Sequence, residues 1–283
     1  MPEQISFAGR TMVIVGKHKK ERVIAPIMEK VLGVTCITVP EIDTDLLGTF
    51  SGEIERANDV ITTLRKKCDL AAEKYPGHLI VASEGSFGMH PVVPLAHADD
   101  EVMLCVDYTN QLEFFARKLT TVTNFNAQEI HSVKNLMHFA IKAQFPQHAL
   151  ILRRSKTDNT HITKGIQDET TLREVYQQLR ARFGQAYIET DMRALFNPTR
   201  MKVIGEVAED LAGKMNSRCP VCTHPGFSVQ DAVSGLPCGM CGTPTQTTQH
   251  LVLRCTHCGH SALKAPLHGK KVEDPQFCDF CNP

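Results

Sequence analysis

The sequence predicts an α/β protein with a mixed sheet flanked by helices and a small C-terminal two-zinc ribbon domain. Apolar strand-like and helix-like segments alternate over roughly the first two hundred residues, a pattern typical of α/β folds. Eight of the eleven cysteines fall into four C-x-x-C pairs near the C-terminus. We therefore divide the chain into an α/β domain, residues 1–215, and a double zinc-ribbon domain, residues 216–283.

Composition narrows the class of protein further. The 283 residues include 31 Lys and Arg against 31 Asp and Glu, and 42% are apolar, as in an ordinary globular chain. No apolar run approaches the roughly 18 to 20 residues that span a bilayer, and the N-terminus does not read as a signal peptide. We expect a cytoplasmic protein without a membrane partner. Zero net charge also disfavours general nucleic-acid binding.

Local patterns place the elements of the first domain. A short apolar run that ends at glycine, such as TMVIVG, is typical of a buried strand, and apolar residues every three or four positions indicate a helix. These patterns predict strands at 11–16, 34–39, 78–83 and 148–154, and extended segments at 101–108 and 114–125. They predict helices at 19–32, 58–74, 127–145, 168–183 and 199–215.

The C-x-x-C pairs predict two structural zinc sites, because each such turn supplies half of a tetrahedral thiolate set. The predicted ligands are Cys219, Cys222, Cys238, Cys241, Cys255, Cys258, Cys278 and Cys281. Disulfide bonds among these cysteines are the alternative, but they would need an oxidising compartment. Gaps of 15 residues after Cys222 and 19 after Cys258 match the usual ribbon spacing and favour sequential pairing over interleaved pairing, which stays open.

Filled zinc sites fold the tail but leave no open position for catalysis. The tail carries five Lys and Arg against four Asp and Glu. With eight thiolates and two Zn²⁺ its net charge becomes about −3. Phosphate-binding ribbons usually have the opposite sign, so nucleic acid is an unlikely partner. A protein partner for the tail is an alternative.

Three basic residues follow the first predicted strand, in the segment GKHKKER. Lys17, Lys19 and Lys20 at the start of a helix would suit a phosphate. The segment lacks the glycine spacing of a P-loop, and a solvated helix start explains it equally well.

Three carboxylates are candidate catalytic residues. Glu53 and Glu55 lie among small residues in GTFSGEIER, and Glu84 leaves a predicted strand into the glycine-rich ASEGSFGMHP. Carboxylates at the ends of strands often act as Mg²⁺ ligands or general bases. The alternative for Glu84 is a turn residue that caps a backbone N–H group.

Two arginines near the last predicted helix are candidates for an anion site. The sequence Asn197-Pro198-Thr199 predicts a turn and N-cap, and Arg193 and Arg200 lie close to that helix start. Pairing with Glu189, Asp191 and the acidic loop is the alternative. Together with the lysines, these residues would bind phosphates.

The chain resembles a bacterial family known only as a domain of unknown function. The motifs GTFSGEIER, ASEGSFG and TDMRALFNPTRMK carry this resemblance, together with the tail pattern CPVC…PCGMCG…CTHCGH…FCDFC. It covers nearly the whole chain and implies no activity.

The order of segments also resembles the inosine/xanthosine triphosphatase family of nucleotide pyrophosphatases. The Lys-bearing loop, the Glu84-Gly85 pair and the Thr163-Lys164-Gly165 segment carry this second resemblance. It implies Mg²⁺-assisted hydrolysis of a phosphoanhydride in a nucleotide or related phosphorylated small molecule, with Thr163 and Gly165 binding substrate. The competing hypothesis is a ligand-sensing or adaptor protein whose zinc ribbons bind a protein or nucleic-acid partner.

Overall fold

The computed structural model describes residues 5–39 and 59–283, which divide into two compact units. The larger unit comprises Phe7–Ala212, and the smaller one is built mainly of Gly213–Pro283. Helices and strands are mixed along the larger unit, which confirms the predicted α/β class. No helix in the described ranges is both long and apolar enough to cross a membrane.

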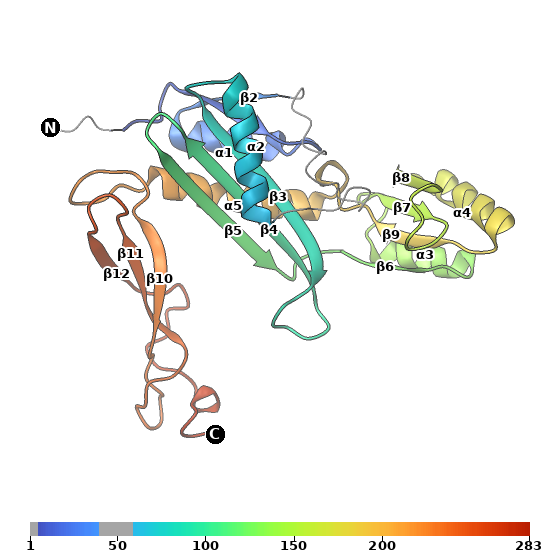
Figure 1. Cartoon of the computed structure of the whole chain (residues 1–283). Helices are drawn as coiled ribbons and strands as arrows, with labels where there is room; N and C mark the ends of the chain where they lie inside the picture. Colours follow the sequence, from blue (N-terminus) through green and yellow to red (C-terminus); the bar gives the residue numbers. More distant parts are fainter. Residues whose placement is uncertain (1–4, 40–58) are drawn as a thin grey trace. The chain divides into compact units, whose positions relative to one another are not determined.

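A five-stranded mixed sheet forms the first half of the larger unit (Figure 1). The first strand along the chain pairs in parallel with the second and the third. The fourth strand pairs antiparallel with the third and with the fifth. The strand order is β2 (Thr35–Thr38), β1 (Thr11–Val15), β3 (Leu79–Met89), β4 (His97–Asp107) and β5 (Leu112–Thr120).

Helices cover both faces of this sheet. Helix α2 (Val60–Lys74) packs Leu64, Cys68 and Ala71 on one face, against apolar residues of β1, β3 and β4. Figure 1 shows α2 in front of the strands, with α1 (Glu21–Leu32) and α5 (Pro198–Asn216) behind them. Alternate residues of each strand therefore point to two different environments, because side chains along a strand alternate between faces.

The hairpin of β3 and β4 departs from the prediction. The sequence predicts a strand that ends at 83 and a glycine-rich loop over 82–91, but β3 continues to Met89 and pairs with β4 along eleven residues. Antiparallel pairing satisfies the backbone of the glycine-rich segment, so no loop is needed there. Gly85 lies opposite Glu101, and Phe87 lies opposite Asp99.

A second, four-stranded sheet completes the larger unit, in the order β6 (Ala127–Glu129), β9 (Tyr187–Thr190), β7 (Leu150–Arg153) and β8 (Ile162–Ile166). Helices α3 (Val133–Lys142) and α4 (Glu169–Phe183) bury their apolar faces against it. The helix predicted over 127–145 is therefore wrong at its start, where β6 pairs with β9 and Ser132 then caps α3. The sequence does not predict β8 and β9, because ITKGI and YIET mix polar with apolar residues and so lack an apolar run.

Helix α5 begins as the sequence predicts. The short 3-10 turn η2 (Ala194–Phe196) precedes it, and the Asn197 side-chain oxygen accepts a hydrogen bond from the Arg200 N–H at 3.0 Å. Pro198 occupies the first helical position, where its missing N–H costs nothing.

The smaller unit is a three-stranded antiparallel ribbon, ordered β10 (Ser228–Ser234), β11 (Thr248–Arg254) and β12 (Ser261–Lys264), with a 3-10 turn η3 (Pro275–Phe277) near its end. Its apolar core is small: Phe227 packs with Leu253, Ala262 and three cysteines, Cys219, Cys222 and Cys255. A domain with so little apolar core usually depends on metal ions or disulfides for its stability.

Candidate functional site

The eight tail cysteines form two clusters, each with four sulfur atoms within 4.8 Å of one another. One contains Cys219, Cys222, Cys255 and Cys258, and the other contains Cys238, Cys241, Cys278 and Cys281. Sulfur–sulfur distances between pairs are 3.6 and 3.7 Å in the first cluster and 3.7 and 3.9 Å in the second. A tetrahedron with Zn–S bonds of 2.3 Å has edges of about 3.8 Å. Both clusters therefore suit zinc.

The pairing is interleaved, so the favoured sequential pairing is wrong. Strands β10 and β11 run antiparallel, with Ser228 opposite Arg254, so the pair before β10 meets the pair after β11. Strand β12 then carries the chain back along β11, and the last pair meets the one between β10 and β11. Sheet topology, rather than distance along the sequence, selects the partners.

Each C-x-x-C turn is also held by the backbone. The N–H of the residue after the second cysteine bonds to the carbonyl of the first cysteine at 2.8–3.0 Å in all four turns. Gly242 and Gly259 adopt left-handed backbone conformations at this position, and Thr223 does so at a φ of 60°. The N–H groups of Val221 and Met240 point at the sulfurs of Cys219 and Cys238, each at 3.4 Å. Burial acts to raise the pKa of Cys219, but the backbone donors and neighbouring thiols outweigh it and lower the pKa to about 7, which favours the thiolate form that a metal requires.

A cluster of buried charged residues lies in the larger unit, on the face of the five-stranded sheet opposite α2. Glu101 and Asp99 point to this face from β4, and they are 1% and 0% exposed. The Arg200 Nε donates to Glu101 Oε1 at 2.5 Å, and the Lys20 Nζ donates to the Ser83 hydroxyl at 3.2 Å. Two acids and two cations thus converge beyond the carboxyl end of β1, an edge at which open α/β sheets build their sites.

Unpaired carboxylate oxygens distinguish this cluster from an ordinary ion-pair network. Within the described part of the chain, both oxygens of Asp99 and Oε2 of Glu101 are buried without a hydrogen-bond partner. Buried polar atoms are almost always satisfied, because leaving one unpaired costs about 1–3 kcal/mol. The arrangement therefore has acceptor capacity for a cation or a proton.

Burial shifts two of the titrating groups. Burial raises the pKa of Asp99 to about 8, and the neighbouring Glu101 carboxylate acts in the same direction. Burial also lowers the pKa of Lys20 to about 8, against the opposing attraction of Glu101. Such perturbed acids and bases are typical of functional sites.

Glu84 lies on the other face of the sheet. It alternates with Ser83 and Gly85 along β3 and pairs with Lys67 of α2, and both side chains are about nine-tenths buried. The structure therefore separates Glu84 from the Asp99–Glu101 pair, which sequence analysis missed. The alternation of acids in HADDEVMLCVD was an available signal, since extending the predicted strand toward its N-terminus puts 99, 101, 103 and 105 on one face. Glu53 and Glu55 lie outside the described residues.

Only one of the three predicted lysines enters the cluster. Lys20 is buried, Lys17 is half-buried and Lys19 is exposed. His18 and Lys19 have φ angles of 68° and 60°, a left-handed conformation that costs energy in residues other than glycine. Strain of this kind is common in loops that form sites.

Of the other predicted substrate residues, two lie in the four-stranded sheet, Arg193 follows its strand β9, and Arg200 lies in α5. Thr163 and Gly165 belong to β8, and the Gly165 N–H donates to the buried Asp191 carboxylate at 3.0 Å. Arg193 pairs with the same carboxylate at 2.6 Å and stacks on Phe196. Pairing with Asp191 was the alternative that the sequence offered for Arg193, whereas Arg200 pairs with Glu101 instead.

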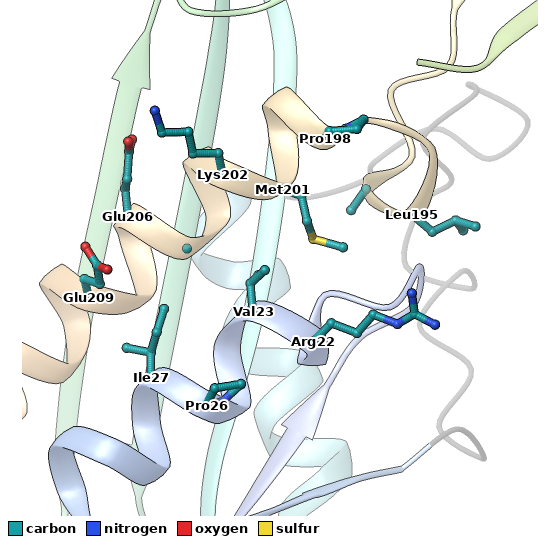
Figure 2. A pocket seen from close by; sticks show the side chains of 12 residues that line it. Arg22, Val23, Pro26, Ile27, Leu195, Pro198, Met201, Lys202, Glu206 and Glu209 are labelled. Atoms are coloured by element: carbon teal, nitrogen blue, oxygen red, sulfur yellow. The ribbon is translucent and has the colours of Figure 1, made fainter. Parts of the chain in front are cut away.

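A separate groove of about 830 Å³ lies between α1 and α5 (Figure 2). Figure 2 shows Val23 and Ile27 extending from α1 and Met201 from α5 into the space between the two helices, with Lys202 and Glu206 on α5 at one side. Its lining is predominantly apolar, and its charged side chains, unlike those of the buried charged cluster, are exposed or half-buried: Arg22, Lys202, Glu206 and Glu209.

The fold and the two cysteine clusters define an α/β protein whose C-terminal ribbon carries two four-cysteine sites compatible with zinc. A family model described as "Domain of unknown function (DUF6671)" matches residues 67–283, well over half of the chain, and the protein belongs to this family. No curated protein matches the sequence. The resemblance to inosine/xanthosine triphosphatases thus gains no support from these comparisons.

Double substitutions will report the cysteine pairing through metal content. With interleaved sites, Cys219→Ser with Cys255→Ser removes ligands from one site only, and about one metal ion per chain should remain. Cys219→Ser with Cys238→Ser damages both sites, so little metal should remain. Elemental analysis of the purified proteins measures this. Sequential pairing would reverse the two results.

The close approach at Gly85 predicts a position-specific loss of stability. A Cβ there would overlap Glu101 Oε1 and Arg200 Nη2, whereas a Cβ at Gly88 on the same strand meets nothing within 4 Å. Gly85→Ala should lower the free energy of unfolding by about 1–3 kcal/mol. Urea unfolding checks this, with Gly88→Ala as the control. Equal effects of the two substitutions would contradict the packing described.

The raised pKa of Asp99 predicts a pH dependence. The unfolded carboxyl titrates near 4 and the folded one at about 8. Unfolding therefore releases a proton between these values, and the contribution of Asp99 to stability falls as pH rises through the window. Without Mg²⁺, the free energy of unfolding of Asp99→Asn, compared with that of wild type, should rise by at least about 1 kcal/mol from pH 5 to pH 8. Urea unfolding at several pH values measures the difference. Parallel profiles would refute a raised pKa.

Proposed function

We propose that this protein acts on a phosphorylated small molecule by Mg²⁺-assisted hydrolysis of a phosphoanhydride, at the cluster of Lys20, Ser83, Asp99, Glu101 and Arg200. The observation that carries the proposal is the buried pair Asp99 and Glu101, three of whose four carboxylate oxygens accept no hydrogen bond from the described residues. Two cationic side chains lie beside that pair. Acidic oxygens next to phosphate-binding cations are the components that such a reaction requires.

The donor set suits Mg²⁺. This ion prefers oxygen ligands and is commonly held by one or two carboxylates together with substrate phosphates. Asp99 and Glu101 would hold it, and when bound it supplies Lewis-acid polarisation of a phosphoryl oxygen. Glu53 and Glu55 remain candidates for the same metal. Glu84 is a weaker candidate than Asp99 and Glu101 because its carboxylate pairs with Lys67 on the opposite face of the sheet.

The cations would position the phosphates. Lys20 is 7% exposed and Arg200 is 2% exposed, so a phosphate oxygen near them would be largely shielded from water. Attraction between opposite charges is stronger under such shielding. Lys17 and Lys19 belong to the same loop and would attract an approaching anion at longer range.

The tail has a structural role in this proposal, with zinc in both cysteine clusters. Reduced thiolates suit a cytoplasmic location, where disulfides are rare. The expected negative charge of the zinc-bound tail disfavours binding to nucleic acid, whose phosphate backbone is also negative.

The test is release of phosphate or pyrophosphate from a panel of nucleotides and other phosphoanhydrides, with and without Mg²⁺. We expect turnover that needs Mg²⁺ and falls by at least about a hundredfold in Asp99→Asn and in Glu101→Gln. In the same proteins, Mg²⁺ should raise the thermal midpoint of wild type but not of Asp99→Asn.

Asp100→Asn is the matched control. Asp100 lies between the two acids on β4, and its carboxylate pairs with Arg117 at 2.8 Å on the opposite face. This variant should keep both turnover and the response to Mg²⁺. Absence of turnover across the panel would sink the reaction, and an equal loss in Asp100→Asn would show that the site is misplaced.

The second candidate function is an adaptor that binds a protein through its ribbon. Two apolar side chains favour it: Met240 and Phe280, each directly before a cysteine of the second cluster, are 78% and 74% exposed. Exposed apolar side chains that gather in one place often mark interaction surfaces. If the panel gives no turnover and Mg²⁺ has no effect, this becomes the leading function.

A further inference from the structure

The four-stranded sheet has one covered face and one hollowed face. Leu150, Leu152 and Ile188 point to the core that α3 and α4 cover. The alternate residues Ile151 and Arg153 line a pocket of about 330 Å³ on the opposite face. This volume is at the lower end of the range for small-molecule sites.

Charged side chains surround this pocket unevenly. Four cations line it, namely Arg153, Lys156, Lys164 and Arg193. Two acids, Glu189 and Asp191, also line it and pair with the two arginines. The lining therefore has an excess of two positive charges over negative ones. A phosphate monoester, which carries −1.5 to −2 near neutral pH, matches this excess better than a carboxylate does.

Arg153 gives the pocket a built polar floor. The residue is 5% exposed, and its guanidinium is fixed by Glu189 and by Asn159, whose side-chain oxygen accepts from Nη1 at 3.1 Å. Its buried Nε has no hydrogen-bond partner among the described residues. A guanidinium that is held in place by other contacts and lines a pocket is suited to an anionic oxygen.

Aromatic and apolar side chains complete the lining. Phe125 and Tyr187 offer rings, and Ile151, Ala127 and Met192 offer apolar surface. Flat rings bind well against aromatic side chains, which bury a large area in a defined geometry. The pocket thus combines an anion site with surface for one ring.

We infer that the open face of the four-stranded sheet binds a small phosphate monoester that carries a flat ring, such as a nucleoside monophosphate. Arg153, Lys156 and Lys164 bind the phosphate, and Phe125 and Tyr187 contact the ring. The inference does not rest on the proposed reaction, since Asp99 and Glu101 are absent from the lining.

Calorimetric titration of the full chain with adenosine 5′-monophosphate, without Mg²⁺, tests the inference. We expect saturable binding with a Kd of about 1 mM or tighter. Adenosine and inorganic phosphate should each bind at least about tenfold more weakly, because each lacks one half of the ligand. Benzoate, a ring with a carboxylate, should also bind more weakly. Absence of saturable binding of the monophosphate, or equal binding of any of the other three, would overturn the inference.

Charge reversal locates the site. Lys156→Glu with Lys164→Glu should weaken binding at least about tenfold. The matched control is Lys134→Glu with Lys142→Glu, which makes the same change in net charge on exposed positions of α3. Thermal unfolding verifies that both proteins fold. Equal weakening by the two double variants would overturn the assignment to this pocket.

Asp99→Asn separates this inference from the proposed function. The variant should lose Mg²⁺-dependent turnover but still bind the monophosphate as wild type does. Loss of monophosphate binding in Asp99→Asn would show that the ligand occupies the Asp99–Glu101 cluster instead.

Discussion

Arg200 holds the larger unit together at one buried point. Its guanidinium pairs with Glu101 of β4 and donates to the Met192 carbonyl after β9 at 2.5 Å. The same group lies 5.1 Å from the centre of the Phe87 ring on β3. One side chain at the start of α5 thus joins the two sheets. Leaving a buried arginine without partners costs free energy, so these contacts constrain the relative positions of α5, β4 and the segment after β9.

The charged cluster and the cysteine clusters contribute to the protein in opposite ways. Burying Asp99 and Lys20 in charged form destabilises the fold. Burial raises the pKa of Asp99 and lowers that of Lys20, so in each case it favours the neutral form. The two cysteine clusters, in contrast, could each hold a metal ion, and a bound metal ion would stabilise a ribbon that has almost no apolar core. A fold keeps a costly buried cluster when it serves a purpose other than stability, which is why the proposed chemistry is placed there and not in the tail.

Sequence analysis succeeds where a local pattern decides the outcome and fails where pairing partners decide it. The apolar spacing of α1, α2, α4 and α5 and the Asn197 cap are local, and the structure confirms them. The glycine-rich continuation of β3 is a strand only because β4 lies beside it, and that same pairing brings Glu101 to Gly85. Glu84 is a candidate catalytic residue because it follows an apolar run, and the alternation of the strand directs its side chain toward Lys67.

The interleaved ribbon has a consequence for synthesis of the chain from its N-terminus. Once Cys241 has left the ribosome, the first two C-x-x-C pairs can bind a metal ion together. Neither of the two clusters seen in the structure is complete until Cys258 has been synthesised. A metal ion captured at that stage would close the 15-residue loop that separates Cys222 from Cys238, whereas the native loop to Cys255 spans 32 residues. A doubled loop costs only about 0.6 kcal/mol more to close. Because this difference is small, the pairing of β10 with β11 can move the metal ion from the first two C-x-x-C pairs to the native set of ligands. This requires fast exchange of thiolates at the metal.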